Sequence, residues 1–197
     1  MQLIEMEKYA KENNIPIIEK DSIDYIKKYI KENNVKNILE LGTAIGYSTI
    51  HMALVSDDIH ITSIERDDER FSIAEASIEE YELTDRVELI NKDILDINLY
   101  EKYDLIFIDA AKSQYINFFN KFKDNLTDNG VFISDNLGFH GLVETDKYIP
   151  SRNVRGLVRK ISNYIDFLKE NEEFETEFID IGDKIGVSKK KTNLDKK

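Results

Sequence analysis

Short apolar runs alternate with longer amphipathic segments along most of this chain, and this alternation restricts the possible folds more than any other feature. We interpret the apolar runs as strands and the amphipathic segments as helices. Strands that are separated by helices form a parallel sheet whose two faces are both covered. The sequence therefore predicts a single α/β domain over residues 1–197, with any ligand bound beyond the carboxyl ends of the strands.

The predicted elements follow each other in a regular order. Two helices open the chain within residues 1–34, at about 2–13 and 19–34. The expected strands are then 36–42, 60–65, 86–91, 103–109 and 130–135, and the expected helices are 46–56, 67–83, 112–125 and 152–169. Residues 174–181 and 183–190 predict an antiparallel hairpin, and 189–197 a frayed, charged tail. The expected sheet is seven-stranded and mostly parallel, with helices on both faces and the hairpin at its C-terminal end.

The composition excludes several classes of site and of protein. The chain has no cysteine, which rules out disulfides, zinc sites built on cysteine and cysteine nucleophiles. No signal peptide is recognisable at the N-terminus, and no apolar run approaches the ~18 residues of a membrane span. We therefore expect a cytoplasmic protein without a membrane partner. The formal net charge of −12 disfavours non-specific binding of nucleic acid, although a local basic patch stays possible.

An acidic residue stands at or just after the carboxyl end of each of the first five predicted strands. A single acid at such a place often caps the following helix. Because the carboxyl ends of parallel strands meet at one edge of the sheet, five acids there predict a ligand site. These acids are Glu40, Glu65, Asp93, Asp109 and Asp135.

The loop after the first strand, ELGTAIGYS (40–48), indicates which ligand this is. A dinucleotide-binding loop needs three glycines, and here Ala44 stands in the place of the middle one, so the loop is not shaped for a diphosphate. Ser48 can bind a carboxylate at the start of the following helix. Glu65 suits the two hydroxyls of a ribose, and Asp93 suits an adenine amine. Ribose, adenine and a small zwitterion without phosphate together describe S-adenosylmethionine.

Three stretches, ELGTAIGYS, IDAAK (108–112) and SDN (134–136), carry a resemblance to a known family. They are similar to the metal-dependent O-methyltransferases of the catechol and caffeoyl-CoA group, which belong to the class I S-adenosylmethionine-dependent methyltransferases. The resemblance extends over about residues 15–188. It implies the Rossmann-like fold of class I methyltransferases and assembly as a homodimer.

The resemblance also implies a set of site residues. Asp109, Asp135 and Asn136 match the ligands of a divalent metal, and three oxygen ligands without an imidazole suit a hard cation such as Mg²⁺ or Mn²⁺. Lys112 matches the general base, with Asp109 as its catalytic neighbour, because a nearby dication favours a neutral amine. The residues that match contacts to the methyl donor are Ile18, Gly42, Ser48, Glu65, Asp93, Ile94 and Asp109.

The acceptor must offer two neighbouring oxygens to the metal, and both a catechol and 5-hydroxyuridine do so. Residues 147–165 contain no Asp or Glu, and Arg152, Arg155 and Arg159 share one face of the helix predicted there. The stretch RNVR (152–155) resembles bacterial tRNA 5-hydroxyuridine methyltransferases, which implies a tRNA anticodon stem-loop as partner and 5-methoxyuridine at the wobble position as product. The short segment before the first strand, with little room for a lid over a small acceptor, favours the same interpretation.

Three alternatives stay open at this level. The arginines can form an ordinary solvated helix face, and the enzyme can then methylate a small catechol-type molecule. A protein of another class, either a non-catalytic adenosine-binding protein or a nicotinamide-dependent one, is disfavoured by Ala44 and by the acids of SDN, for which it has no use.

Overall fold

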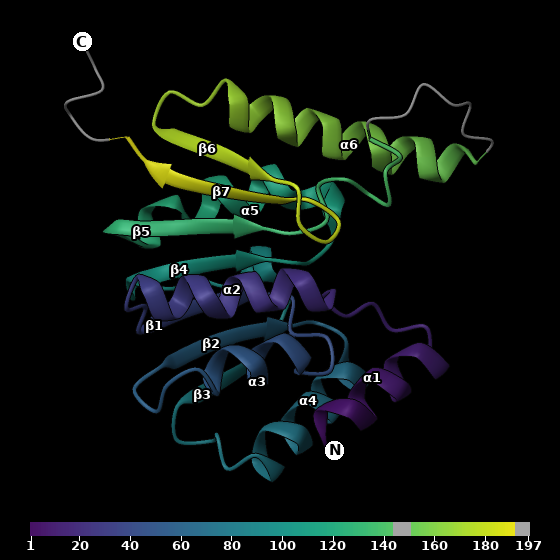
Figure 1. Ribbon diagram of the computed structural model, residues 1–197, viewed down its shortest axis with the longest axis vertical. Helices are drawn as coiled ribbons and strands as arrows, with labels where there is room; N and C mark the ends of the chain where they lie inside the picture. The colour runs from purple at the N-terminus through teal and green to yellow at the C-terminus, as the bar shows by residue number, and fades with distance from the viewer. Residues whose placement is uncertain (144–150, 192–197) are drawn as a thin grey trace.

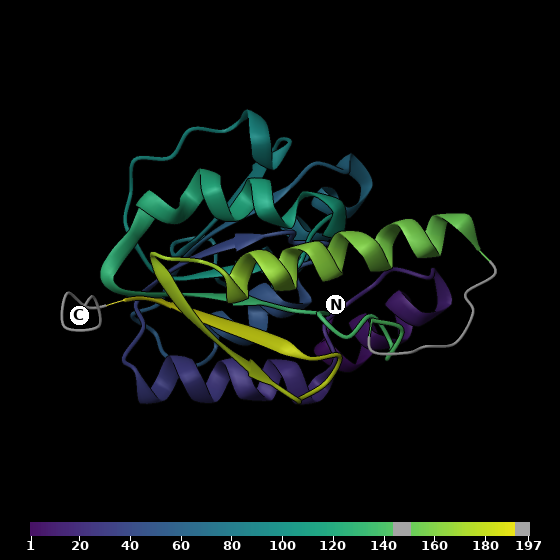
Figure 2. The same ribbon diagram turned by 90° about the horizontal axis from the view of Figure 1, so that it is seen from above.

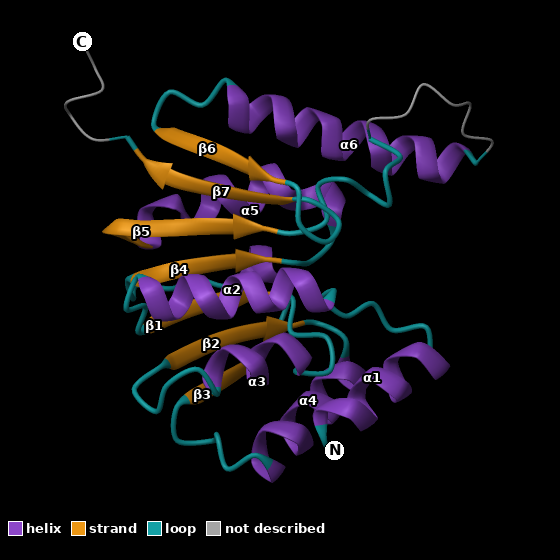
Figure 3. Cartoon of the chain, viewed as in Figure 1, coloured by secondary structure: helices purple, strands orange, loops and turns teal. Residues whose placement is uncertain are grey.

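The computed structural model describes residues 1–143 and 151–191, and these residues form one seven-stranded sheet between two helical layers (Figure 1). The strand order is β3-β2-β1-β4-β5-β7-β6. Strands β1 to β5 are parallel, whereas β7 runs antiparallel to both β5 and β6 (Figure 3). The strands are β1 (Asn37–Leu41), β2 (His60–Glu65), β3 (Val87–Asn91), β4 (Tyr103–Ile108), β5 (Leu126–Ser134), β6 (Phe174–Ile179) and β7 (Ile185–Lys190).

The helices cover both faces of the sheet because the parallel strands are apolar on both sides. Ile38, Leu105 and Phe107 pack with α1 to α4 on one face. Leu39, Ile106 and Phe132 pack with α5 and α6 on the other, and Figure 2 shows α2 and this second pair of helices on opposite sides. The helices are α1 (Leu3–Glu12), α2 (Lys20–Glu32), α3 (Tyr47–Ala53), α4 (Asp68–Glu80), α5 (Tyr115–Phe122) and α6 (Arg152–Lys169), with 3₁₀ turns η1 (Ile94–Asp96), η2 (Lys112–Gln114) and η3 (Lys123–Asn125).

The architecture confirms the predicted α/β fold, including the antiparallel C-terminal hairpin. Two predicted boundaries are wrong. The helix predicted at 112–125 is helical only over α5, with a 3₁₀ turn at each end. Lys189 and Lys190 belong to β7, where they pair with Glu175 and Phe174, so they are not part of a frayed tail. The rest of the predicted tail, 192–197, lies outside the described residues.

Two helices extend past the sheet on the side to which the parallel strands point. The first half of α6 projects beyond the strand ends, and α1 lies on the same side (Figure 1). The carboxyl ends of the parallel strands are thus flanked by helices from the two ends of the chain. None of the helices among the described residues is long and apolar enough to cross a membrane.

Candidate active site

A cavity of about 350 Å³ lies at the carboxyl ends of β1, β2 and β4. Its lining includes all seven residues predicted to contact the methyl donor, together with Lys112 and Asn136. Asp135 is buried behind this wall, with 1% of its surface exposed. The structure therefore brings the predicted site residues together, since the cavity is bordered by Ile18, Gly42, Ser48, Glu65, Asp93, Ile94, Asp109, Lys112 and Asn136.

The loop after β1 is shaped by one necessary glycine and one strained alanine. Gly42 has φ +108°, and a Cβ built on it would lie 2.2 Å from the backbone oxygen of Asp109, so no larger residue fits between the ends of β1 and β4. Ala44 has φ +48°, a left-handed conformation that is costly for any residue with a Cβ. Its amide donates to Glu65 Oε2 at 2.9 Å, and this bond helps to hold the loop in that conformation.

Glu65, at the end of β2, is held by the backbone around it. Its Oε1 accepts from the amides of Arg66 (3.0 Å) and Asp67 (2.9 Å), in addition to the bond from Ala44 to Oε2. A carboxylate has about four acceptor positions, so Glu65 keeps capacity for a hydroxyl donor from the cavity. The arrangement presents a rigid acceptor where a ribose hydroxyl is expected.

Asp93 follows β3 and begins the turn η1. The Leu95 amide donates to its Oδ1 at 2.9 Å, and Arg66 Nη1 donates to its Oδ2 at 3.1 Å. The backbone bond from Leu95 has the largest effect and, together with Arg66, lowers the pKa of Asp93. The Asp93 carboxyl group is therefore charged at neutral pH. An ionised acceptor at this wall suits an exocyclic amine.

Glu40, at the end of β1, is fully buried beneath the same loop. Its carboxyl accepts hydrogen bonds from the hydroxyls of Ser48, Thr49 and Ser63. Burial raises the pKa of Glu40 to about 7, although the three hydroxyls act in the opposite direction. The Ser48 hydroxyl proton is therefore committed to Glu40, and this side chain faces the cavity as an acceptor.

The two acids and the amide predicted to bind metal come together at the ends of two paired strands. Asp109 follows β4, and Asp135 and Asn136 follow β5, next to the register pair Ile108 and Ser134. Asn136 takes φ +62°, and its Nδ2 donates to Asp109 Oδ1 and to Asp135 Oδ2, each at 3.1 Å. One amide group thus separates two carboxyl groups.

The two acids of this trio have raised pKa values, as the buried Glu40 does, but they also lie beside each other and share one amide donor. Burial raises the pKa of Asp135 to about 7, and the negative charge of Asp109 adds to this effect. Desolvation also raises the pKa of Asp109, and the positive charge of Lys112 opposes it. Within residues 1–143 and 151–191, no three His, Cys, Asp or Glu side chains are grouped as metal ligands. The trio has two carboxyl groups and an amide, and this oxygen-only set fits a hard divalent cation that would compensate their charge.

Comparison with known proteins establishes the family. The sequence model of the O-methyltransferase family matches residues 1–191. This chain belongs to the O-methyltransferase family. Caffeoyl-CoA O-methyltransferase 2 of Petunia hybrida is 28% identical to it over 166 residues, which are 80% of this chain and 66% of that protein.

Solved structures share the fold of this O-methyltransferase. A provisionally assigned caffeoyl-CoA O-methyltransferase from Staphylococcus aureus is 38% identical, with a TM-score of 0.91 over 97% of this chain and 93% of that chain. The O-methyltransferase from Bacillus cereus, solved in complex with SAH, is 24% identical, with a TM-score of 0.81 over 96% and 90% of the two chains. These findings confirm the predicted class of enzyme, an S-adenosylmethionine-dependent O-methyltransferase.

Sequence reasoning missed the support of Asp135. Ser22 on α2 donates to Asp135 Oδ1 at 3.2 Å across 113 residues of chain, and the Tyr115 hydroxyl donates to the Asp135 backbone oxygen at 3.3 Å. Ser22 is fully buried beside Ile23. A serine on the apolar face of a predicted helix is the one sequence signal that could have indicated this contact. Pro16 and Ile17 also border the cavity, so the segment before α2 supplies part of its wall.

The three arginines predicted to bind tRNA lie outside the cavity. Arg152, Arg155 and Arg159 occupy exposed positions of α6. They stand on the half of α6 that projects past the strand ends (Figure 1). The structure thus places these arginines at the same edge of the sheet as the O-methyltransferase site, beyond the carboxyl ends of the parallel strands.

Proposed function

We propose that this enzyme transfers the methyl group of S-adenosylmethionine to one of two neighbouring oxygens of its acceptor, with Mg²⁺ or Mn²⁺ held by Asp109, Asp135 and Asn136. The observation that carries this proposal is the pair of carboxyl groups at the ends of β4 and β5, which lie side by side and share the Asn136 amide as a donor. A divalent cation held by these residues would supply Lewis-acid chemistry that favours ionisation of the attacking hydroxyl.

The residues of the chain position both substrates. The rigid carboxylate of Glu65 orients the ribose of the methyl donor, while Asp93 and the backbone near Ile94 border the adenine. Gly42 allows the loop to approach Asp109, and Ile18 closes the opposite wall. A fixed donor keeps the methyl carbon in line with the attacking oxygen, which is the main requirement of a displacement at carbon.

Lys112 takes up the proton in this mechanism. It lies three residues after Asp109, at the start of η2, and borders the cavity. As the acceptor oxygen forms its bond to the methyl carbon, the carbon–sulfur bond of the sulfonium breaks and the hydroxyl proton passes to the Lys112 amine. The products are the methyl ether and neutral S-adenosylhomocysteine.

We propose 5-hydroxyuridine at the wobble position of tRNA as the acceptor, with 5-methoxyuridine as the product. Support comes from the basic face of α6 beside the site, in a chain whose net charge of −12 otherwise repels a polyanion. Arginine contacts to phosphates position a nucleic acid without reading its sequence. The anticodon stem-loop is thus the proposed partner. A small catechol-type acceptor is the second candidate, favoured by the names of the relatives from Petunia hybrida and Staphylococcus aureus.

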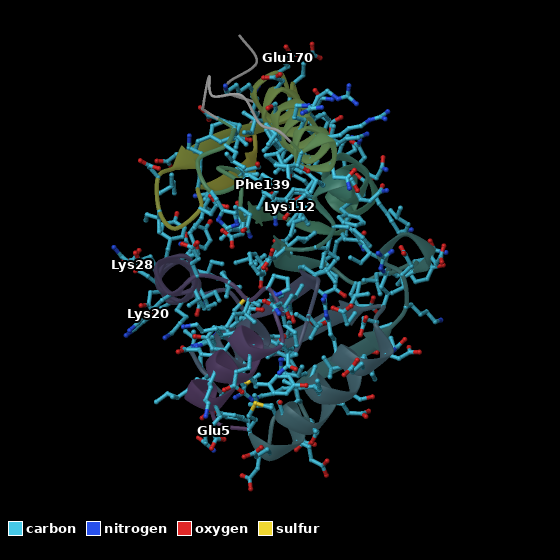
Figure 4. All side chains as sticks on the ribbon, turned by 90° about the vertical axis from the view of Figure 1, so that its right-hand side faces the viewer. Glu5, Lys20, Lys28, Lys112, Phe139 and Glu170 are labelled. Atoms are coloured by element: carbon cyan, nitrogen blue, oxygen red, sulfur yellow. The ribbon has the colours of Figure 1, made fainter. Side chains whose placement is uncertain are left out.

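The two acceptors are separated by comparing wild type with a variant in which Arg152, Arg155 and Arg159 are all changed to Glu. The matched control carries the same three charge reversals at Lys20, Lys28 and Lys31 of α2; Figure 4 shows Lys20 and Lys28 pointing away from α6. Each phosphate contact adds about one unit to the salt slope of binding.

On hypomodified tRNA, the arginine variant should show a raised KM with a flatter salt dependence, whereas the lysine control should resemble wild type. Methylation of a free catechol should be alike in all three proteins. Efficient methylation of the catechol by wild type, with no transfer to tRNA, would establish the small-molecule function instead.

A further inference from the structure

A second cavity, of about 160 Å³, lies between the segment Lys112–Asn117 and α6. Its floor consists of Tyr115 and Tyr164, whose rings meet edge to face at 5.3 Å. Both hydroxyls are engaged with the end of β5, Tyr115 with the Asp135 backbone oxygen and Tyr164 with Ser134 Oγ at 2.7 Å. The floor is therefore rigid and belongs to the support of the acid–amide trio.

The rim of this cavity carries hydrogen-bond donors and no acid. The lining residues are Lys112, Ser113, Tyr115, Ile116, Asn117, Lys160, Asn163 and Tyr164. Two acid-free stretches of the chain, 110–123 and 151–165, meet at this place. With the residues that the structure describes, neither Lys160 nor Asn163 forms a side-chain hydrogen bond or ion pair. An ammonium and an amide that have no side-chain partner among the described residues, in a hollow whose described lining includes no carboxylate, suit an anion with several acceptor oxygens.

Lys112 connects this cavity to the site of methyl transfer. Among the described residues, it is the one side chain that borders both cavities. In Figure 4 it lies near the centre of the strand-end face, below α6. The two cavities are therefore neighbours that share the Lys112 side chain in their walls.

We propose that this cavity, with Lys160 and Asn163 at its rim, is a subsite for a phosphate group carried by the acceptor. The inference rests on the proposed function, because it assumes an acceptor bound at Lys112. In a pyrimidine nucleotide with the usual anti conformation, the C5 edge of the base faces the 5′-phosphate of the same nucleotide. The 5′-phosphate of the wobble residue is thus suitably placed, and a coenzyme A thioester offers the same chemistry from a different source.

The test uses two pairs of acceptors that differ by their phosphates: 5-hydroxyuridine with its 5′-monophosphate, and caffeic acid with caffeoyl-CoA. Dissociation constants are measured by calorimetry in the presence of S-adenosylhomocysteine, and KM by methyl transfer. The variants are Lys160→Gln and Asn163→Asp, both at exposed positions. The matched control is Lys169→Gln on the same helix, because Lys169 lies over the Phe178 ring and does not border the cavity.

Both variants should weaken binding of the phosphate-bearing member of one pair by about ten-fold, the loss of one charge-assisted hydrogen bond. Binding of the partner without phosphate should be unchanged, and Lys169→Gln should behave as wild type. The pair that responds identifies the source of the phosphate.

Two results would overturn the subsite. One is equal binding by wild type of both members of each pair, and the other is a phosphate preference that survives in Lys160→Gln and Asn163→Asp. Failure of the proposed function looks different. In that case no compound of either pair is methylated, while the phosphate preference still depends on Lys160.

Discussion

The acids at the ends of β1 to β3 differ from those at the ends of β4 and β5, although all five occupy the same edge of the sheet. Glu40 accepts from three hydroxyls, Glu65 from three backbone amides, and Asp93 from an amide and a guanidinium. Asp109 and Asp135 share the two contacts of a single Asn136 amide, and Asp135 accepts one further hydroxyl. Asp109 and Asp135 lie next to each other and share one donor group, whereas no two acids of the first group share a donor atom.

One pattern in the sequence, an acid at each strand end, therefore serves two purposes. The acids of β1 to β3 shape the loops and present fixed acceptors to the methyl donor. The acids of β4 and β5 are placed in like-charged proximity, which is unfavourable unless a cation joins them.

Asp135→Asn should separate activity from stability. The variant keeps only the Asp109 carboxyl group at the proposed metal site. The rate of methyl transfer should therefore fall by about 1,000-fold, because several kcal/mol of transition-state stabilisation are lost. The metal-free protein should nevertheless be more stable, since a buried charge next to Asp109 is removed. Turnover with Mg²⁺ and urea unfolding in chelator check the two halves. The distinction between the two groups of acids would be contradicted if the Asp135→Asn enzyme were active in chelator, or if it were less stable than wild type in chelator.

Glu40 should make stability depend on pH. Its folded pKa of about 7 lies above the ordinary value of 4.5 for a glutamate, so its contribution to stability is fully present below pH 4.5 and is lost as pH rises through 7. Between these limits, wild type should lose about 3 kcal/mol of unfolding free energy relative to Glu40→Gln. Urea unfolding of both proteins at pH 5 and pH 8 measures this difference. An identical pH dependence in the two proteins would mean that the three hydroxyls hold Glu40 charged.

Glu65→Ala should weaken binding of the methyl donor by about ten- to hundred-fold, because a pair of charge-assisted hydrogen bonds is lost. Part of the loss arises indirectly, because the Ala44 amide also loses its acceptor. Calorimetry with S-adenosylmethionine measures the affinity. Glu65→Gln, which keeps one oxygen for the Ala44 amide, is the control and should bind more tightly than Glu65→Ala. Equal donor affinity of Glu65→Ala and wild type would remove Glu65 from the site.

Ala44→Gly should have the smallest effect. Glycine removes the cost of the left-handed φ of +48° but adds backbone entropy to the unfolded chain, so stability should change by less than about 1 kcal/mol. Gly42→Ala in the same loop is the contrasting variant, because its Cβ would meet the Asp109 backbone oxygen. Thermal unfolding of both variants measures the contrast. A destabilised Ala44→Gly would show that the alanine side chain contributes to packing.

The fold was largely predictable because periodicity is a local property of the sequence. A parallel sheet also brings its strand ends to one edge, which is why Glu65, Asp109 and Asn136 could be assigned to one site. Contacts between distant segments were not predictable in this way. The bond from Ser22 to Asp135 depends on how α2 packs over the sheet, and the cavity at Lys160 depends on how far α6 overhangs it. Neither arrangement has a local pattern in the sequence.

The central claim is that Asp109, Asp135 and Asn136 together hold one divalent cation. Calorimetric titration of Mn²⁺ or Mg²⁺ into the metal-free enzyme with S-adenosylhomocysteine tests it most directly. We expect one metal-binding site per chain in wild type, which is abolished in Asp135→Asn and retained in Glu40→Gln. Absence of any binding to wild type, together with full methyl transfer in the presence of a chelator, would contradict it.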